Sequence, residues 1–145
     1  MTKFHILDIL SITHDRLISL DHMDGIYKIL NYLTGENLFT HQLVRVSKTC
    51  KPYLLKTYPT LSDSRIEIAF EKLTKVLDHL RQQNSPDDDI MLAIKGWAVQ
   101  YVYPVTGEYL DILPLDAPYQ HMNPVDELVW MKGDDDGIIA VNVEG

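Results

Sequence analysis

The sequence predicts an α+β protein with an N-terminal β-hairpin, a helical middle of three to four helices and a C-terminal β-α-β unit. Three observations support this fold class. Apolar residues recur every three or four positions through much of 21–101, which is helical spacing. β-branched and apolar residues are concentrated near both ends of the chain, which favours strands. At 145 residues and 46% hydrophobic content, the chain can form one core, so we expect a single domain over 1–145.

The N-terminal quarter predicts a hairpin followed by a helix. Residues 6–13 are rich in isoleucine, leucine and threonine, and we expect them to pair with residues 16–19. Asp21 is a candidate N-cap for the helix that follows. Gly35 is expected at its left-handed C-cap.

The middle of the chain predicts further helices. Residues 38–46 are expected to form a loop or a short helix, and residues 52–57 a short helix that begins at a proline. Ser64 and Glu67 form a capping-box pattern, and the apolar stripe behind them predicts a helix to about Gln83.

A break at residues 84–86 precedes the last predicted helix of the middle region, which Ser85 is expected to cap. Gly96 lies within this helix, where a glycine could permit close packing against a neighbour. The C-terminal unit is predicted from a strand at 109–113, a helix at 123–130 and a strand at 138–143.

Charge divides the chain into two unlike halves. The formal net charge is -8, but residues 1–83 carry +2 and residues 84–145 carry -10. An acidic chain is a poor non-specific binder of nucleic acid, because phosphates repel it, so direct nucleic-acid binding is not expected. The first twenty residues and the hydropathy of the chain predict no signal peptide and no membrane span, and the single Cys50 fits a reducing cytoplasm.

One basic window interrupts this acidic background. Residues 37–62 contain four Lys or Arg and no Asp or Glu, and Arg45, Lys48 and Lys51 recur every three residues. On a helix these three cations would share a face, where an anion could bridge them. Alternatively, they neutralise the acidic half, within the chain or across a homo-oligomer.

Two acidic runs have structural explanations beside functional ones. The run Asp87, Asp88 and Asp89 follows Ser85-Pro86, where a helix dipole favours negative charge. The run Asp134, Asp135 and Asp136 lies between two glycines, as a cation-binding loop or a solvated turn would. Both runs are also candidates for contact with a partner protein.

Motifs for catalysis and for metal or cofactor binding are missing from the sequence. It has no HExxH pair, no P-loop, no GxSxG and no GxGxxG, so we expect no metal and no cofactor. Lys48 and Lys51 could lower the pKa of the Cys50 thiol, and His41 is the one nearby base in sequence, which makes a weak nucleophile hypothesis.

Several segments resemble one family. The helix ending in Thr34-Gly35, the Thr40-His41-Gln42-Leu43 segment and Pro52-Tyr53-Leu54-Leu55 are similar to small uncharacterised proteins encoded by tailed phages and prophages. The closing segment, residues 121–128, is similar as well. Val44 and Tyr58 depart from the family's proline and histidine. The family carries no established activity. The resemblance implies a phage origin, and it makes four residues candidates for a functional patch: Thr40, His41, Gln42 and Arg45.

Two hypotheses for function remain. The first is an acidic, phage-encoded interaction protein that binds a basic surface on a host protein, for example a nucleic-acid-binding defence complex that it inhibits. The second is a small-ligand binder or simple enzyme that uses the basic window on a nucleotide or another phosphorylated anion. It would use six residues: Thr40, His41, Gln42, Arg45, Lys48 and Lys51.

Overall fold

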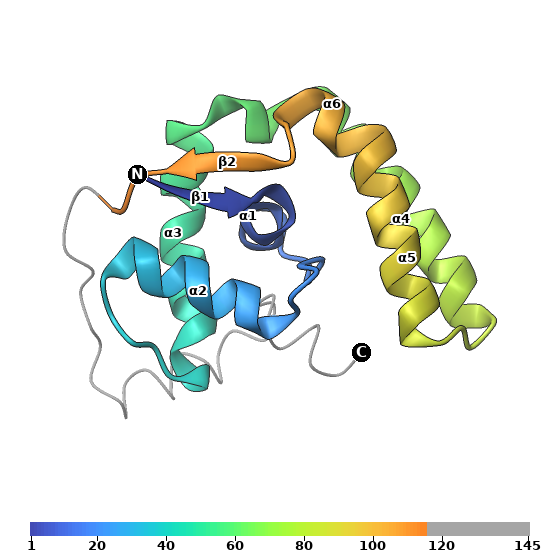
Figure 1. Cartoon of the computed structure of the whole chain (residues 1–145), viewed down its shortest axis with the longest axis horizontal. Coiled ribbons are helices and arrows are strands. Elements are labelled where there is room, and N and C mark those ends of the chain that lie inside the picture. Colours follow the sequence, from blue (N-terminus) through green and yellow to red (C-terminus); the bar gives the residue numbers. More distant parts are fainter. Residues whose placement is uncertain (116–145) are drawn as a thin grey trace.

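The computed structural model describes residues 1–115, which form a mostly helical α+β fold (Figure 1). Two strands, β1 (Thr2–His5) and β2 (Tyr109–Ile112), form an antiparallel sheet in which Thr2 pairs with Ile112 and His5 with Tyr109. The sheet therefore joins the two ends of the described chain. The α-helices are α1 (Ile6–Thr13), α2 (Met23–Thr34), α3 (Leu43–Thr57), α4 (Ser64–Gln82), α5 (Asp87–Trp97) and α6 (Tyr103–Thr106). Two short 3-10 helices, η1 (Thr40–Gln42) and η2 (Pro59–Ser62), precede α3 and α4, and a π-helical segment, η3 (Ala98–Val102), continues α5.

The predicted N-terminal hairpin is wrong, because residues 6–13 form helix α1. All eight of its residues are buried, so its side chains contact the core on every side. A short apolar run of this kind has no polar face, and periodicity alone cannot distinguish a buried strand from a buried helix. The Ser11 hydroxyl donates to the carbonyl oxygen of Leu7 (2.7 Å) and accepts from the backbone N–H of Ile18 (3.0 Å). These bonds hold the chain that follows α1 against the helix.

His5 caps the start of α1. Its Nδ1 accepts a hydrogen bond from the backbone N–H of Leu7 (3.1 Å), which satisfies one of the free donors of the first helical turn. The other ring nitrogen, Nε2, lies 3.1 Å from the Tyr103 hydroxyl. Because Nδ1 must be free of a proton to accept, the cap requires the tautomer with hydrogen on Nε2. One side chain thus connects α1 to α6.

The predicted helix after residue 21 is confirmed as α2, with one change at its start. Gly35 ends it in the left-handed conformation (φ 72°), and the Gly35 N–H donates to the Asn31 carbonyl (2.8 Å). The N-cap residue is His22, one residue after the predicted Asp21. Helices α1 and α2 contact each other, and both contact α3.

Gly25 marks a close approach of α2 to a buried polar pair. The Ser19 hydroxyl donates to Asp8 Oδ1, and both side chains are buried against α2. A Cβ added to Gly25 would overlap Ser19 Oγ and Asp8 Oδ1 and would lie 3.0 Å from Asp8 Cγ. Burial raises the pKa of the Asp8 carboxyl, because desolvation disfavours its charged form; the bond from Ser19 opposes this rise.

The basic window folds differently from the prediction. Residues 43–57 form one continuous helix, α3, with Pro52 inside it, in place of a loop or short helix followed by a separate helix at the proline. A proline inside a helix removes one hydrogen bond and costs about 3 kcal/mol. The apolar residues Leu43, Val46, Cys50 and Leu54 lie on both sides of the proline in sequence and are fully buried. Their packing outweighs the cost of the proline.

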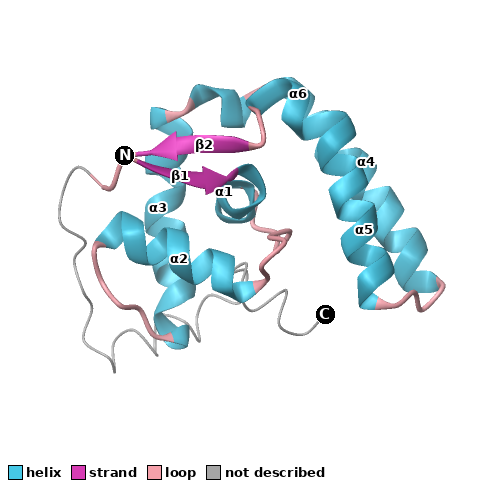
Figure 2. Ribbon diagram, viewed as in Figure 1, coloured by secondary structure: helices cyan, strands magenta, loops and turns pink. Residues whose placement is uncertain are grey.

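Helices α4 and α5 form a hairpin beside the rest of the fold (Figure 2). The predicted α4 is confirmed, although Asp63 rather than Ser64 is its N-cap: Asp63 Oδ1 accepts from the Arg65 N–H (2.9 Å). Hydrogen bonds from the Arg65 guanidinium and N–H lower the pKa of Asp63 to about 2. Ser85 makes no side-chain cap to α5. The prediction that Gly96 packs closely against a neighbour is also wrong, since a Cβ there would meet no atom within 4 Å.

An aromatic stack attaches the hairpin to the body formed by α1, α2, α3 and the sheet. The His14 ring lies parallel to Phe70 of α4 (centroids 4.5 Å, planes 9° apart), and Phe70 meets Trp97 edge to face (5.2 Å). Trp97 Nε1 donates to the Ala69 carbonyl (2.6 Å), which fixes α5 on α4. Burial lowers the pKa of His14, a change that Glu67 partly opposes. The attachment lies near the middle of α4.

The C-terminal prediction is confirmed only in part. The strand expected at 109–113 is present as β2, but it pairs antiparallel with β1. The helix predicted at 123–130 and the strand at 138–143 lie outside the described residues. Within residues 1–115, every helix is too short or too polar to cross a bilayer.

Candidate functional site

The basic face of α3 borders an open cleft. Lys48 and Lys51 line it together with Asp15, Pro52 and Leu55, and its volume is about 400 Å³. We call it the α3 cleft. Lys51 Nζ forms an ion pair with Asp15 Oδ2 at 2.7 Å, and Asp15 adopts a positive φ of 54° at the end of α1.

This ion pair shows that part of the basic window is neutralised within the chain, by an acid from the N-terminal half. Lys48 and Arg45, about one and two helical turns closer to the start of α3, also have interaction partners. An anion at the α3 cleft would therefore have to compete with Asp15 for Lys51.

The Thr40-His41-Gln42 segment connects α2 to α3 through its side chains. Thr40 Oγ1 shares a hydrogen bond with the Tyr27 hydroxyl on α2. Gln42 Oε1 accepts from the backbone N–H of Phe39 (2.8 Å), while the Gln42 N–H donates to the Phe39 carbonyl (2.9 Å), a reciprocal capping arrangement. The His41 and Phe39 rings are parallel, with centroids 6.1 Å apart, and Phe39 is 68% exposed. Of the four candidate residues that the family resemblance indicates, Thr40, His41 and Gln42 thus make structural contacts at this junction.

Cys50 lies in the core on the opposite side of α3 from solvent. Its side chain is 0% exposed, and burial raises the pKa of the thiol to about 12. The neighbouring lysines therefore do not produce a thiolate, and Cys50 is unsuited to nucleophilic attack.

The acidic run at 87–89 forms the first turn of α5, at the tip of the hairpin. All three carboxylates are exposed, and none has an ion-pair partner among residues 1–115. They lie in the first turn of a helix, as the sequence predicted, where the positive end of the helix dipole stabilises negative charge. The second acidic run, Asp134–Asp136, lies outside the described residues.

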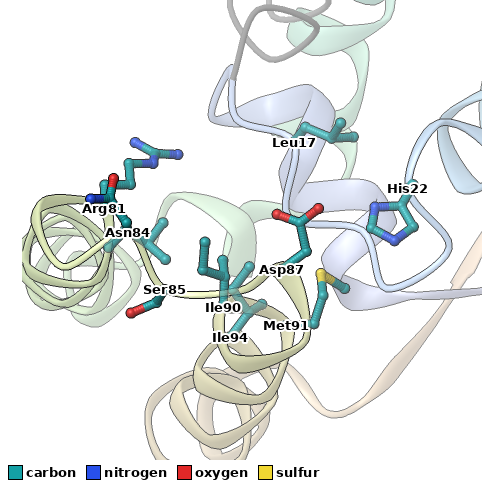
Figure 3. A pocket seen from close by; sticks show the side chains of 10 residues that line it. Leu17, His22, Arg81, Asn84, Ser85, Asp87, Ile90, Met91 and Ile94 are labelled. Carbon is teal, nitrogen blue, oxygen red and sulfur yellow. The ribbon is translucent and has the colours of Figure 1, made fainter.

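A second cleft lies between the distal half of the hairpin and the loop that joins α1 to α2 (Figure 3). We call it the hairpin cleft. Its volume is about 700 Å³ and it is open to solvent. Five apolar residues from three separate segments line it: Leu17, Leu77, Ile90, Met91 and Ile94. Five polar residues complete the lining: His22, Arg81, Asn84, Ser85 and Asp87.

Two of these polar residues, His22 and Asn84, have positive φ values of 55° and 54°. Such values are uncommon for residues with a Cβ and occur at tight turns. Both walls of the hairpin cleft therefore contain a sharp change of chain direction.

Sequence reasoning missed this cleft, apart from Asp87. Ile90, Ile94 and Leu77 belong to apolar stripes that predict buried faces, and the structure leaves the edges of those stripes beside open space. Leu17 and His22 carry no signal of their own, because nothing in the sequence indicates that their loop faces the hairpin. Among residues 1–115, no group of three His, Cys, Asp or Glu side chains could hold a metal ion.

Comparison with known proteins gives one family. Residues 4–64 match the model of a domain of unknown function (DUF7736). No curated protein and no solved structure matches the chain. The matched segment runs from β1 through α3 to the first residue of α4, and it includes Thr40, His41, Gln42 and Arg45. It is consistent with the resemblance to an uncharacterised family, and the α4–α5 hairpin follows it in the chain.

Proposed function

We propose that this protein is a non-enzymatic interaction protein that uses the α4–α5 hairpin to bind a basic surface on a partner protein. The observation that carries the proposal is the composition of the hairpin's exposed surface. Its tip holds three carboxylates without ion-pair partners in the described part of the chain. Along α5 and its π-helical continuation, Leu92 is 68% and Val99 61% exposed. Exposed apolar side chains bordered by polar or charged groups are an arrangement found at protein-binding surfaces.

Electrostatics support this mode of binding. The exposed carboxylates of Asp87–Asp89, at the end of a projecting hairpin, create a negative potential that accelerates encounter with a basic partner and weakens as salt is added. The net charge of -8 on the whole chain also favours a basic partner.

The finer form of the proposal is that a phage encodes this chain and that the partner belongs to the host cell. The Thr-His-Gln-Leu resemblance supports the origin. A host defence complex that binds nucleic acid has a basic surface, and an acidic hairpin would compete with nucleic acid for that surface.

Affinity purification from the host tests the proposal. The full tagged chain would be compared with a variant in which Asp87–Asp89 are all changed to Asn. The control variant Asp21→Asn, Asp24→Asn and Asp111→Asn loses the same number of charges from exposed positions elsewhere.

We expect the parent chain and the control to recover the same partner at low salt, and the hairpin variant to lose it. High salt should release the partner. If the hairpin variant recovers the partner as well as the parent does, or if no partner is recovered, the proposal is wrong.

A second candidate function is favoured by the α3 cleft, where Lys48 and Lys51 line one open space. A nucleotide or phosphorylated anion bound there would raise the thermal stability of the chain by mass action. Lys48→Ala should abolish this effect, and Lys56→Ala, an exposed lysine at the end of α3, is the matched control. A thermal-shift screen of nucleotides and inorganic phosphate that shows no stabilisation would exclude this candidate.

A further inference from the structure

We propose that the hairpin cleft receives an apolar side chain from a basic segment of the partner protein, with a lysine or arginine of that segment beside Asp87. This inference rests on the proposed interaction function and adds to it the chemistry of the partner's binding segment. The acidic tip of the hairpin offers only charged groups. The hairpin cleft offers a concave apolar surface, which can exclude water around an inserted side chain.

The apolar part of the cleft is already formed in the free chain. Ile94 and Leu77 lie at its base and are almost fully buried, while Ile90, Met91 and Leu17 remain partly exposed around them. The aromatic stack of His14 on Phe70 holds the middle of α4 against the body. The distal part of the hairpin, which carries the cleft, extends beyond this attachment (Figure 1). An inserted side chain would therefore bury apolar surface that the fold leaves accessible.

Charges border this apolar base on two sides. Figure 3 shows Arg81 on one side of Ile90 and Ile94 and Asp87 on the other. Neither charged group has an ion-pair partner among the described residues. A segment with an apolar residue between a basic and an acidic one would match both sides, and Asp88 and Asp89 beside Asp87 favour a basic excess.

The openness of the cleft favours a protein segment over a small molecule. Pockets for small ligands enclose most of the ligand surface. This cleft, with a volume of about 700 Å³, is open to solvent, which suits an anchor side chain of a larger partner. A second copy of this chain fits less well, because its own hairpin acids and net charge of -8 would be repelled by Asp87–Asp89.

A selection of random peptides from a ribosome-displayed library against the full chain tests the inference. Selected peptides would be titrated into protein labelled at its isoleucine, leucine and methionine methyl groups. Two matched variant pairs follow from the structure. Met91→Gln changes a cleft residue, and Leu113→Gln makes a similar change at an exposed leucine outside both the cleft and the hairpin. Asp87→Lys changes a lining residue, and Asp111→Lys makes the same charge change at an exposed position on β2, outside the hairpin.

We expect the selected peptides to share an apolar residue next to Lys or Arg and to shift the methyl signals of Ile90, Met91 and Leu17. Met91→Gln and Asp87→Lys should each weaken binding about tenfold, and their controls much less. Thermal unfolding of all four variants would show that each is folded.

Peptides that shift methyl groups elsewhere, or that bind Met91→Gln as well as the parent chain, would overturn the inference. Selection of apolar peptides without basic residues, or concentration-dependent dimerisation lost in Met91→Gln, would also overturn it. The proposed function fails separately, when Asp87–Asp89 prove unnecessary for recovery of the partner. If recovery of the partner is lost when Asp87–Asp89 are changed but is retained in Met91→Gln, the role of the cleft is refuted and the proposed function stands.

Discussion

Gly25 and Gly96 should respond in opposite directions to the same substitution. Both are helical glycines, and replacing glycine by alanine within a helix ordinarily stabilises it by about 1 kcal/mol. At Gly96 nothing within 4 Å opposes a methyl group, so Gly96→Ala should stabilise the chain by roughly 0.5–1 kcal/mol. At Gly25 the methyl group would overlap Ser19 Oγ and Asp8 Oδ1.

The size of the Gly25→Ala effect follows from these contacts. Overpacking in a core costs about 1–3 kcal/mol. Separating the Ser19 hydroxyl from the buried Asp8 carboxyl leaves polar groups without partners and costs about 1–3 kcal/mol more. After the gain in helix propensity, the net loss is on the order of 3 kcal/mol, a large share of the ~5–15 kcal/mol that stabilises a domain.

Urea denaturation of the parent and both variants, followed by circular dichroism, measures these effects. We expect the midpoint of Gly25→Ala to fall and that of Gly96→Ala to rise, with unchanged slopes. A Gly25→Ala variant as stable as the parent would refute the packing described around Asp8.

Three further predictions concern buried polar groups. The pKa of Asp8 is raised in the folded state, so its contribution to stability is present below its unfolded pKa and is lost as pH rises through the folded value. As the pH rises from acidic to neutral, the free energy of unfolding of Asp8→Asn should therefore increase relative to that of the parent. A difference between the two that does not change with pH would contradict this. His5→Ala should lose about 1 kcal/mol with the α1 cap, and His5→Asn should recover part of it in urea titrations. Cys50 should resist a disulfide reagent in the native chain and react after unfolding, whereas rapid native labelling would show that the thiol is accessible.

The sequence predicted those parts of the fold that depend on local patterns. The capped, one-sided stripes of α2 and α4 specify their own type and limits, and α2 ends at Gly35 as expected. Residues 6–13 lack such a pattern because they are buried on every side. They directly follow β1, whose partner strand lies more than a hundred residues further along the chain, so their surroundings cannot be read from local sequence.

In the candidate site, too, the features that depend on local sequence were predicted and those that depend on distant contacts were not. The residue spacing correctly placed Asp87–Asp89 in a first helical turn. It indicated a shared face for Lys48 and Lys51 only on the condition that their segment is helical, and α3 meets that condition. It did not reveal that Lys51 pairs with Asp15, because that contact depends on how α1 ends. Nor did it reveal the hairpin cleft, whose walls come from segments far apart in the sequence. The stacking of His14 on Phe70 is one of the tertiary contacts that hold these segments near each other. Both features result from tertiary packing rather than local sequence.

Hydrogen–deuterium exchange of the full chain, alone and with the partner that it recovers, tests the central claim most directly. The account predicts slower exchange in the partner complex across residues 77–97, which include the acidic tip and the hairpin cleft. Exchange in α3 should change little. Protection confined to α3, with the hairpin unaffected, would contradict the claim that the hairpin is the binding surface.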